Sequence, residues 1–432
     1  MKHLYILLLV LPLIGFGQGW EQTFGGSGLD VGRSVQQTID GGYIICGDTD
    51  SFGDGYPDIY LIKTDENGEE EWFQIFEEGV HGYSVQQTTD GGYIICGETY
   101  IFDDYNGYDI YLIKTDGSGE EEWSQNYGFS GINDFGRSVQ QTTDGGYIVC
   151  GNTFNSFYGG WEDSGIYVVK TDGSGGEEWV KTFDGYGNGE EVQQTTDGGY
   201  IITGFTNFLG GPNIHLIKID SGGEEEWTQN FGGENFDRGY SVKQTIDGGY
   251  IITGDTQSFW NIWDGLGVYL IKTDENGEEE WSQILGEEQI DFGYSVQQTN
   301  DGGYIITGMT GTSLESMNDM DMYLIKTNEN GYEEWSQTFE EGFGGYSVQQ
   351  TNDEGYIICG ITKGSDSDIY LIKTDSEGNV ETTSTIELPT PTSKRELVKT
   401  TNILGQENTT IKNQPLIELY DDGSTEKKIV IE

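Results

Sequence analysis

The stretch SVQQTIDGGYIICG, residues 34–47, decides the fold because near copies of it recur along most of the chain. Its DGGY motif, or a variant of it, occurs seven times, starting at Asp40, Asp90, Asp144, Asp197, Asp247, Asp301 and Asp353. The copies are spaced by about fifty residues, a period typical of propellers and solenoids. Repetition of one unit therefore organises these 432 residues, and a domain count from length alone does not apply.

Two further markers recur with the same period. YLIKTD or a near relative starts at Tyr60, Tyr111, Tyr167, His215, Tyr269, Tyr323 and Tyr370. A tryptophan follows a glutamate-rich stretch at Trp72, Trp123, Trp179, Trp227, Trp281 and Trp335. Trp20 opens this series without the glutamates. The three markers together define one unit that is copied seven times.

Each unit predicts four short strands. In the first unit they are residues 34–38, 43–47, 58–64 and 69–76, which are rich in β-branched and aromatic residues. An Asp-Gly-Gly turn separates the first two strands, and Asn67-Gly68 is a hairpin signal between the last two. Four antiparallel strands without helical periodicity are typical of a propeller blade. We therefore expect an all-β, seven-bladed β-propeller of four-stranded blades.

The two ends of the repeat array predict that the ring closes. Residues 20–24 form a fourth strand that lacks the rest of its unit, and Thr382 stands where the last unit should have its Trp. The N-terminal strand can therefore complete the seventh blade and leave no open sheet edge. An open β-solenoid is the alternative, but it would carry shorter repeats and distinct capping units.

The repeat resembles those of kelch-type and quinoprotein-type propellers, in which glycines precede a strand and a Trp closes the blade. It departs from kelch repeats because its Gly pair precedes the second strand. It departs from quinoprotein dehydrogenases because it has no vicinal Cys pair. The unit is most similar to the DGGY repeats of exported bacterial proteins. We therefore do not assign the partners of kelch proteins to this chain, and we expect no cofactor.

The chain is strongly acidic, with 75 Asp and Glu against 20 Lys and Arg and a formal net charge of −55. Such a charge repels nucleic-acid backbones and anionic membrane surfaces, so neither is expected as a partner. The aromatic content of 13% is too high for a disordered acidic chain. Most of the carboxylates are expected to keep an exported surface soluble.

The N-terminal residues 1–17 predict a cleavable signal peptide. Lys2 precedes an apolar run, and Gly15 and Gly17 supply the small residues before a cut. The run is shorter than the ~20 residues of a transmembrane helix, and no later segment approaches that length. We expect the propeller over residues 18–382, followed by a Pro- and Thr-rich linker and a small β-module at residues 383–396 and 397–432.

Within the tail, alternating runs at residues 416–420 and 428–431 flank a turn and indicate a β-hairpin. The tail resembles the C-terminal sorting domain of the Bacteroidetes type IX secretion system, with matches at residues 402–406, 415–417, 422–423 and 427–430. The resemblance implies export through the periplasm and across the outer membrane, with the secretion machinery as a partner. It also implies four sorting-signal residues: Gly405, Gly423, Lys427 and Lys428. An ordinary β-hairpin domain is the alternative.

Four cysteines occupy one position of the repeat: Cys46, Cys96, Cys150 and Cys359. Threonine fills this position in the other three units. Equivalent positions in neighbouring blades lie beyond the ~7 Å between Cα atoms that a disulfide spans. We expect buried free thiols.

The repeat Trp residues are expected to pack between adjacent sheets rather than to bind a ligand. The second Gln of SVQQT is present in all seven copies: Gln37, Gln87, Gln141, Gln194, Gln244, Gln298 and Gln350. We expect it to satisfy backbone groups inside each blade. Its neighbour varies once, to Lys243.

Calcium is a weak possibility at two kinds of acidic loop. The turns of the DENG type place Gly fourth, which does not fit an EF-hand, so turn chemistry explains them. Asp48, Asp50, Asp54 and Asp58 form a better cluster of oxygen ligands, but later units do not repeat it.

Catalysis has little support from residue types. Of the three His, His3 lies in the signal peptide, His215 replaces a strand Tyr, and His81 has no spacing-related partner. His-based metal sites and Ser-His-Asp triads are therefore not expected. With 75 acidic residues, a glycosidase-type carboxylate pair cannot be recognised from sequence. A face that combines carboxylates with an unpaired Lys243, Arg33 or Arg137 would favour an enzyme.

Aromatic residues of the variable loops between second and third strands are the candidate ligand contacts: Trp161, Trp260, Trp263, Phe205 and Phe208. Two tall loops beside a short one could form a groove for sugars, although these side chains could instead pack their own loops. The leading hypothesis is a secreted or cell-surface, non-enzymatic binding propeller for polysaccharide or a surface protein. The alternatives are an extracellular glycan hydrolase or lyase, and an adhesion scaffold without a small ligand.

Overall fold

The computed structural model describes residues 19–53, 57–101, 107–129, 132–154, 165–184, 187–206, 212–258, 265–286, 290–312, 319–380, 397–402, 415–420 and 425–429. The chain divides into two compact units, residues 1–381 and 382–432. No helix among the described residues is long and apolar enough to cross a membrane.

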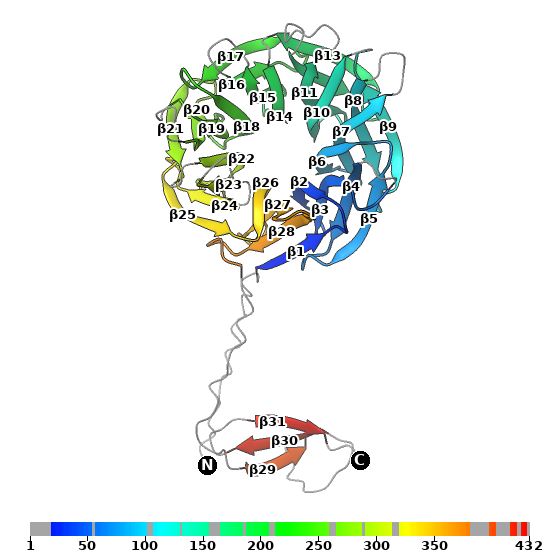
Figure 1. Ribbon diagram of the computed structural model, residues 1–432, viewed down its shortest axis with the longest axis vertical. Helices are drawn as coiled ribbons and strands as arrows, with labels where there is room; N and C mark the ends of the chain where they lie inside the picture. The colour runs from blue at the N-terminus through cyan, green and yellow to red at the C-terminus, as the bar shows by residue number, and fades with distance from the viewer. Residues whose placement is uncertain are drawn as a thin grey trace, which may run out of the picture. The chain divides into compact units, whose positions relative to one another are not determined.

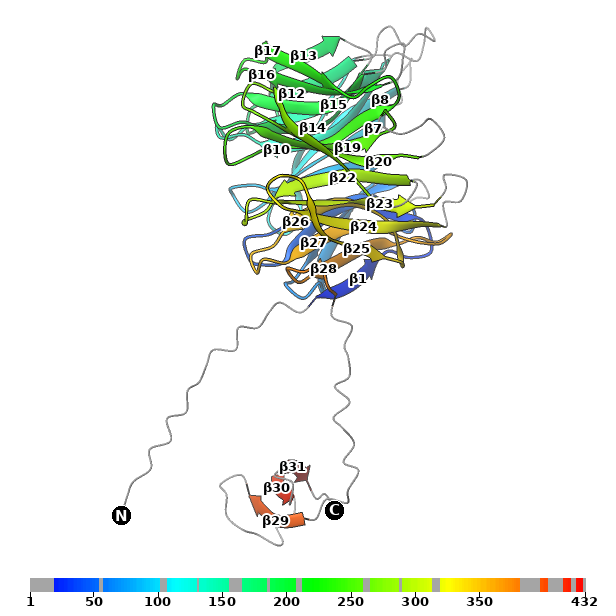
Figure 2. The same cartoon turned by 90° about the vertical axis from the view of Figure 1, so that its left-hand side faces the viewer.

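The first unit is a closed ring of seven antiparallel four-stranded sheets, which confirms the predicted fold (Figure 1). Blade one runs from the inside outward as β2 (Asp30–Gln37), β3 (Tyr43–Thr49), β4 (Asp58–Thr64) and β5 (Glu70–Phe76). The innermost strand therefore begins four residues before the predicted one. The strands cross the thickness of the ring, as its side view shows (Figure 2).

The remaining strands repeat this order. Blade two contains β6 (His81–Gln87), β7 (Tyr93–Ile101), β8 (Gly107–Thr115) and β9 (Glu121–Tyr127). Blade three contains β10 (Asn133–Gln141), β11 (Tyr147–Phe154), β12 (Gly165–Thr171) and β13 (Glu177–Asp184). Blade four contains β14 (Gly187–Gln194), β15 (Tyr200–Thr206), β16 (Asn213–Ile219) and β17 (Glu225–Phe231). Blades five and six contain β18 (Asp237–Gln244), β19 (Tyr250–Thr256), β20 (Gly267–Thr273), β21 (Glu279–Leu285); β22 (Ile290–Gln298), β23 (Tyr304–Gly311), β24 (Met320–Thr327), β25 (Glu333–Phe339).

The seventh blade closes the ring with the N-terminal strand, as predicted. It contains β26 (Gly342–Gln350), β27 (Tyr356–Thr362) and β28 (Ile369–Thr374), and its outer strand is β1 (Trp20–Phe24). β1 and β28 pair antiparallel, with Trp20 opposite Lys373 and Phe24 opposite Ile369. An edge that would otherwise be open is thereby paired.

Buried clusters between neighbouring sheets form the core. In one of them, Ile44 and Cys46 of blade one pack with Val85 and Ile95 of blade two. The repeat Trp residues add an edge-on or tilted ring contact across each interface, such as Trp20 with Tyr43 at a centroid distance of 5.7 Å. The contact recurs at Trp72–Tyr93, Trp123–Tyr147, Trp179–Tyr200, Trp227–Tyr250, Trp281–Tyr304 and Trp335–Tyr356. The predicted packing role of these Trp residues is confirmed.

The turn after the third strand must approach the Trp of the preceding blade closely. Gly68 has φ 80°, and a Cβ at this position would lie 2.5 Å from the Trp20 ring. Both the positive φ and the contact require glycine. Asp65 Oδ1 accepts the N–H groups of Asn67 and Glu69, which confirms turn chemistry in this loop.

A buried lysine in the third strand of each blade ties the turns to the sheet. Lys63 is 3% exposed and lies 3.1 Å from Asp40 of the DGGY turn and 2.9 Å from Glu71 of the outer strand. The same triad recurs in blades two to six, and in blade seven Lys373 retains only the aspartate, Asp353. Seven of the 20 basic residues therefore serve the fold.

All four cysteines are buried and free, as predicted. Cys46 packs against Gly82 of the next blade, where an added Cβ would lie 2.6 Å from the sulfur. Burial raises the pKa of the Cys46 thiol well above its ordinary value. These residues act as small apolar groups.

The second unit contains a three-stranded antiparallel sheet of β29 (Leu397–Asn402), β30 (Pro415–Tyr420) and β31 (Thr425–Ile429). β30 and β31 correspond to the predicted hairpin, but β31 starts three residues before the predicted run. Lys427 and Lys428 lie on β31, whereas Gly405 and Gly423 lie outside the described residues.

The central channel as candidate functional site

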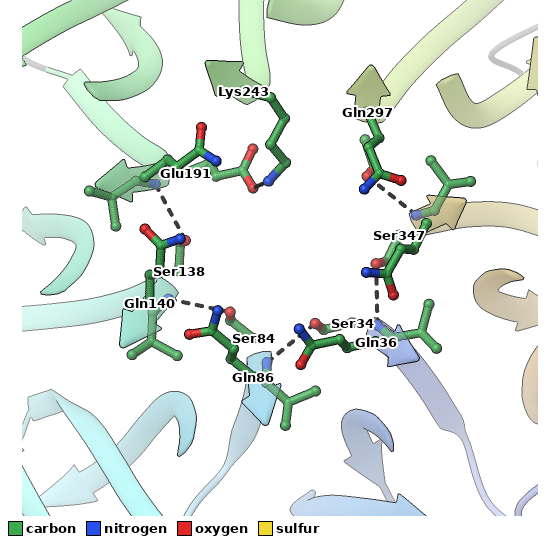
Figure 3. A pocket seen from close by; sticks show the side chains of 18 residues that line it. Ser34, Gln36, Ser84, Gln86, Ser138, Gln140, Glu191, Lys243, Gln297 and Ser347 are labelled. Atoms are coloured by element: carbon green, nitrogen blue, oxygen red, sulfur yellow. Dashed lines mark hydrogen bonds and ion pairs between the residues drawn. The ribbon is translucent and has the colours of Figure 1, made fainter. Parts of the chain in front are cut away.

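The innermost strands of the seven blades line a polar central channel. Ser, Val and Gln of the SVQQT motif recur around it and enclose a cavity of about 310 Å³. The Ser and Gln side chains point inward from successive blades (Figure 3). Two rings of these side chains hold the blades together.

The first of these rings, here called the serine ring, contains Ser34, Ser84, Ser138, Glu191, Ser241, Ser295 and Ser347. Each side chain accepts the backbone N–H of the Val in the next blade. The six hydroxyls do so at 3.2–3.3 Å, and the carboxylate of Glu191 does so at 2.8 Å. The ring is therefore complete.

The second ring, here called the glutamine ring, contains Gln36, Gln86, Gln140, Gln193, Lys243, Gln297 and Gln349. The six glutamines accept a backbone N–H of the next blade at 2.5–2.6 Å, as Gln36 Oε1 does from Gln87. Each such bond contributes about 1 kcal/mol net. Both rings therefore stabilise the closed propeller.

Glu191 and Lys243 replace one member of each ring and pair with one another (Figure 3). Glu191 Oε1 contacts Lys243 Nζ, and its Oε2 accepts Ser241 Oγ–H at 2.7 Å and the Val242 N–H at 2.8 Å. The two departures from the repeat therefore compensate each other. Lys243 is not an unpaired base.

The invariant second Gln connects blades as well. Gln87 Oε1 accepts the N–H of Ile39 from the preceding blade at 2.9 Å, and the same bond recurs at all seven interfaces. The prediction that this Gln bonds backbone groups is confirmed. The prediction that it does so inside its own blade is confirmed in four copies, where Nε2 donates to a carbonyl oxygen of the turn that follows, as Gln37 does to Gly41 at 3.3 Å. The bond across the interface was not predicted.

A third ring, here called the variable ring, lies beside the serine ring. Its members are Arg33, Tyr83, Arg137, Glu190, Tyr240, Tyr294 and Tyr346, and together with the serine ring they line a cavity of about 130 Å³. Each member is the extra residue of a β-bulge between a Gly and the serine-ring residue. A bulge re-aims a side chain, so the variable-ring residue and its neighbour both line the channel.

One sector of the variable ring is cationic. Arg33 pairs with Asp48, with Nη2 to Oδ2 at 2.7 Å. Arg33 and Arg137, from the two neighbouring blades, lie over the Tyr83 ring at 4.8 and 4.1 Å from its centroid. Arg137 has a buried Nε without a hydrogen-bond partner among the described residues. Cation–π contact with Tyr83 therefore orients a guanidinium that no carboxylate holds.

The opposite sector is aromatic. Tyr294 contacts Tyr240 at a centroid distance of 5.1 Å and Tyr346 at 5.5 Å. Phe292 stacks on Tyr294 at 5.9 Å, next to a small apolar cluster that includes Met320. The channel thus has one charged side and one aromatic side at the level of the variable ring.

Several carboxyl groups around this ring are held in a poorly solvated environment. Burial raises the pKa of Asp255 to about 6, although Arg238 and Tyr240 oppose the shift. Burial also raises the pKa of Glu190, opposed by Arg137 and Arg238, and that of Glu98, opposed by His81 and Arg137. Sequence reasoning missed all three groups because acidic residues are too common in this chain to stand out.

His81 has two acidic partners in the structure that its position in the sequence does not indicate. Its Nδ1 lies 3.1 Å from Asp48 Oδ2, and its Nε2 lies 3.8 Å from Glu98 Oε1. Burial alone would raise the pKa of Asp48, but Arg33 and His81 more than offset it and lower that pKa. The partners come from the neighbouring strand and the neighbouring blade, which spacing along the chain does not reveal.

The acidic loop considered for calcium is only partly described. Asp48 is engaged with Arg33 and His81, Asp50 is exposed, Asp58 is buried in β4, and Asp54 lies outside the described residues. No group of three or more potential metal ligands occurs in the described part of the chain.

Most of the predicted loop contacts also lie outside the described residues: Trp161, Phe208, Trp260 and Trp263. Phe205 is described, but it belongs to β15 rather than to a loop. It is half-buried and pairs in register with Asn188 and Ile214. The strand extends to Thr206 here, so the loop assignment of Phe205 was wrong.

The fold and the channel define this chain as a seven-bladed β-propeller with a polar, asymmetrically charged axis. No family model and no curated protein matches it. Among solved structures it is similar to a protein of unknown function from Bacteroides caccae, with 14% identity over 68% of this chain and 95% of that one and a TM-score of 0.44. It is also similar to streptogramin B lyase, with 11% identity over 83% and 99% and a TM-score of 0.48. The Neurospora crassa Pan2 WD40 domain shares 10% identity over 84% and 97%, with a TM-score of 0.48.

Proposed function

We propose that the chain is an exported binding module that holds its ligand at the variable ring and performs no chemistry on it. One observation carries this proposal. In a protein whose blades are near copies, a bulged residue that faces the channel differs in type between blades and lines a cavity. Bulges that re-aim side chains are concentrated next to functional sites.

The serine and glutamine rings are less suited to choosing a ligand. Their oxygens already accept backbone N–H groups across the blade interfaces. A ligand that competed for these oxygens would weaken the ring. Selectivity is therefore assigned to the variable ring.

The chemistry of the variable ring favours a polysaccharide. Tyr240, Tyr294 and Tyr346 offer aromatic surface for the apolar face of a sugar ring. Charged groups on the other side, including Arg137 and Glu190, are partners for hydroxyl and acidic groups. A surface protein that inserts a side chain into the channel is the other binding partner considered.

A glycan-array screen with the chain lacking residues 1–17 tests this proposal. Binding should occur and should be lost in Tyr294→Ala, whereas Tyr332→Ala should retain it because Tyr332 is 61% exposed in an outer turn. Trp161→Ala and Trp260→Ala test the separate sequence-based prediction of loop contacts. A folded wild-type chain that binds neither glycans nor extracellular proteins would contradict the proposal and favour an adhesion scaffold.

Export is part of the proposal and rests on the sequence alone. The signal peptide and the resemblance of the tail to a sorting domain support passage through the periplasm to the outside. Type IX secretion machinery is the proposed partner in that step. Mass spectrometry of the protein recovered from culture medium and cell surface should show an N-terminus at Gln18. Retention of Lys427→Ala/Lys428→Ala in the periplasm would support the sorting role.

An extracellular glycan hydrolase or lyase is the second candidate. The observation in its favour is that Glu190, whose pKa burial raises, lines the same cavity as Arg137, which no described carboxylate pairs. Groups with raised pKa values can act as general acids. New reducing ends, or the ultraviolet absorbance of an unsaturated product, after incubation with a bound glycan would establish this function.

A further inference from the structure

We propose that Arg137 forms an anion subsite of the variable ring that takes the carboxylate of an acidic sugar. This inference rests on the proposed function and deepens it, because it assigns the class of ligand. A uronic acid presents a carboxylate and a ring with an apolar face, and the channel presents a guanidinium and a tyrosine cluster.

The first step is the contrast among the three arginines that the structure describes. Arg33 lies 2.7 Å from Asp48, and Arg238 lies 3.6 Å from Asp255. The buried Nε atoms of Arg137 and Arg238 both lack a hydrogen-bond partner in the described part of the chain, but only for Arg137 does no described carboxylate lie within 4 Å. A buried, unpaired donor on a charged group costs free energy that a bound anion would recover.

The second step is the orientation of the guanidinium. The guanidinium carbon of Arg137, from blade three, lies 4.1 Å from the centroid of the Tyr83 ring in blade two. The guanidinium carbon of Arg33, from blade one, lies 4.8 Å from the same centroid. The Arg137 contact, with a side-chain hydrogen bond to Tyr83, constrains the Arg137 guanidinium. Its Nε has no hydrogen-bond partner among the described residues. A planar fork of N–H donors matches a carboxylate in a bidentate manner.

The third step concerns the acidic groups nearest to Arg137, which would compete with a bound anion for its guanidinium. Glu190 and Glu98 are the acidic groups whose charges act on Arg137. Burial raises the pKa of both carboxyl groups, and neither group forms an ion pair with Arg137 among the described residues. The net charge of −55 repels anions at long range, but this repulsion is screened over about 8 Å at physiological salt. A direct ion pair with Arg137 acts within that distance.

The fourth step concerns the tyrosines that lie across the channel from Arg137 in the variable ring. Arg137 belongs to blade three, whereas Tyr294 and Tyr346 belong to blades six and seven, across the channel. A sugar whose carboxylate contacts Arg137 can therefore present its ring to the tyrosines. A cation is disfavoured as the ligand because Arg33 and Arg137 already occupy the Tyr83 ring.

The experiment measures calorimetric binding of galacturonate, mannuronate and glucuronate oligosaccharides, each also as its methyl ester, to the chain lacking residues 1–17. Variants are Arg137→Gln, Arg137→Lys and the matched control Lys181→Gln. Lys181 lies on the outer strand of the same blade and pairs with Glu224 at 2.6 Å, so its loss changes the net charge equally without touching the channel. Unfolding in urea confirms that each variant is folded.

At least one acidic oligosaccharide should bind, and its methyl ester should bind at least tenfold more weakly. Arg137→Gln should lower the affinity by about tenfold to 100-fold, Arg137→Lys should restore part of it, and Lys181→Gln should match the wild type. Equal binding of acid and ester, or an unchanged affinity in Arg137→Gln, would overturn the subsite while leaving a glycan-binding module. Absence of acidic-sugar binding would also overturn it, and the glycan array then decides separately whether the proposed function stands.

Discussion

The serine and glutamine rings and the variable ring lie next to each other in one channel, yet they follow opposite rules. The first two repeat almost without change, and where one blade departs, with Glu191, the next compensates with Lys243. The variable ring contains Arg, Tyr and Glu without such compensation at Arg137. The comparison teaches that residues which bond the backbone of the next blade are repeated or replaced in a compensating pair, whereas the bulged position, which makes no such repeated bond, differs in type between blades.

The largest loss of stability is expected from removing β1, the strand that closes the ring of blades. Deleting residues 19–24 removes the five-residue pairing of β1 with β28 and the edge-on contact of Trp20 with Tyr43. The free energy of unfolding should fall by about 5 kcal/mol, from the buried Phe24, the half-buried Trp20 and the lost ring contact. Urea unfolding with size-exclusion chromatography measures this. A truncation after residue 380 retains every propeller strand and should leave the urea midpoint unchanged; equal midpoints for both deletions would contradict closure by β1.

A smaller effect is expected at a single interface. Trp227→Ala removes one half-buried ring that contacts Tyr250 at 5.8 Å and should lower the free energy of unfolding by about 3 kcal/mol. Tyr332→Ala, at an exposed turn, should change it by less than about 0.5 kcal/mol. Chemical unfolding followed by fluorescence compares the two, and a Trp227→Ala variant as stable as Tyr332→Ala would show that the interface does not depend on this ring.

Asp255, a buried carboxyl group beside Tyr240 of the variable ring, should show its effect in the pH dependence of stability. The pKa of Asp255 is about 6 in the folded chain because of burial and about 3.9 when unfolded. A raised folded pKa means that the contribution of Asp255 to stability is fully present below pH ~4 and is lost as pH rises through ~6. Relative to wild type, Asp255→Asn should therefore gain up to about 3 kcal/mol between pH 4 and 7. Urea unfolding at several pH values checks this, and a constant difference would rule out the shift.

The smallest expected effect tests the compensated pair. Glu191→Ser and Lys243→Gln should each lower the free energy of unfolding by about 1 kcal/mol, because each leaves a charge in the channel without its partner. The double variant restores the repeated residues and should return close to wild type, with a coupling of about 1 kcal/mol. Additive losses in this double-mutant cycle would show that the two departures are independent.

The repeat predicted most of the fold. Blade number, strand order, closure by residues 20–24, free thiols and the packing of the Trp residues all follow from one unit and its copies. The bond of the second Gln inside its blade was predicted, but its bond across the interface was missed, because periodicity shows what recurs but not whether a bond crosses an interface. The extension of β15 to Phe205 was missed because turn signals alone do not mark where pairing ends.

The candidate site was less accessible to sequence reasoning. Arg33, Arg137 and Lys243 were singled out as bases, but only the structure separates the paired Arg33 and Lys243 from Arg137. Alignment of the seven copies could have shown that the residue before the Ser of SVQQT varies. That the side chain of this residue faces the channel could not be foreseen, because the bulge after Gly82, and the equivalent bulge in each other blade, breaks the alternation of side chains along the strand.

The central claim is that repeated residues carry stability and the variable ring carries recognition. The most direct test is one parallel measurement of glycan-array signal and urea midpoint for wild type, Arg137→Gln and Trp227→Ala. The account predicts that Arg137→Gln loses the signal and keeps the midpoint, and that Trp227→Ala keeps the signal and unfolds at lower urea. Retained binding by Arg137→Gln, together with lost binding by a still-folded Trp227→Ala, would contradict it.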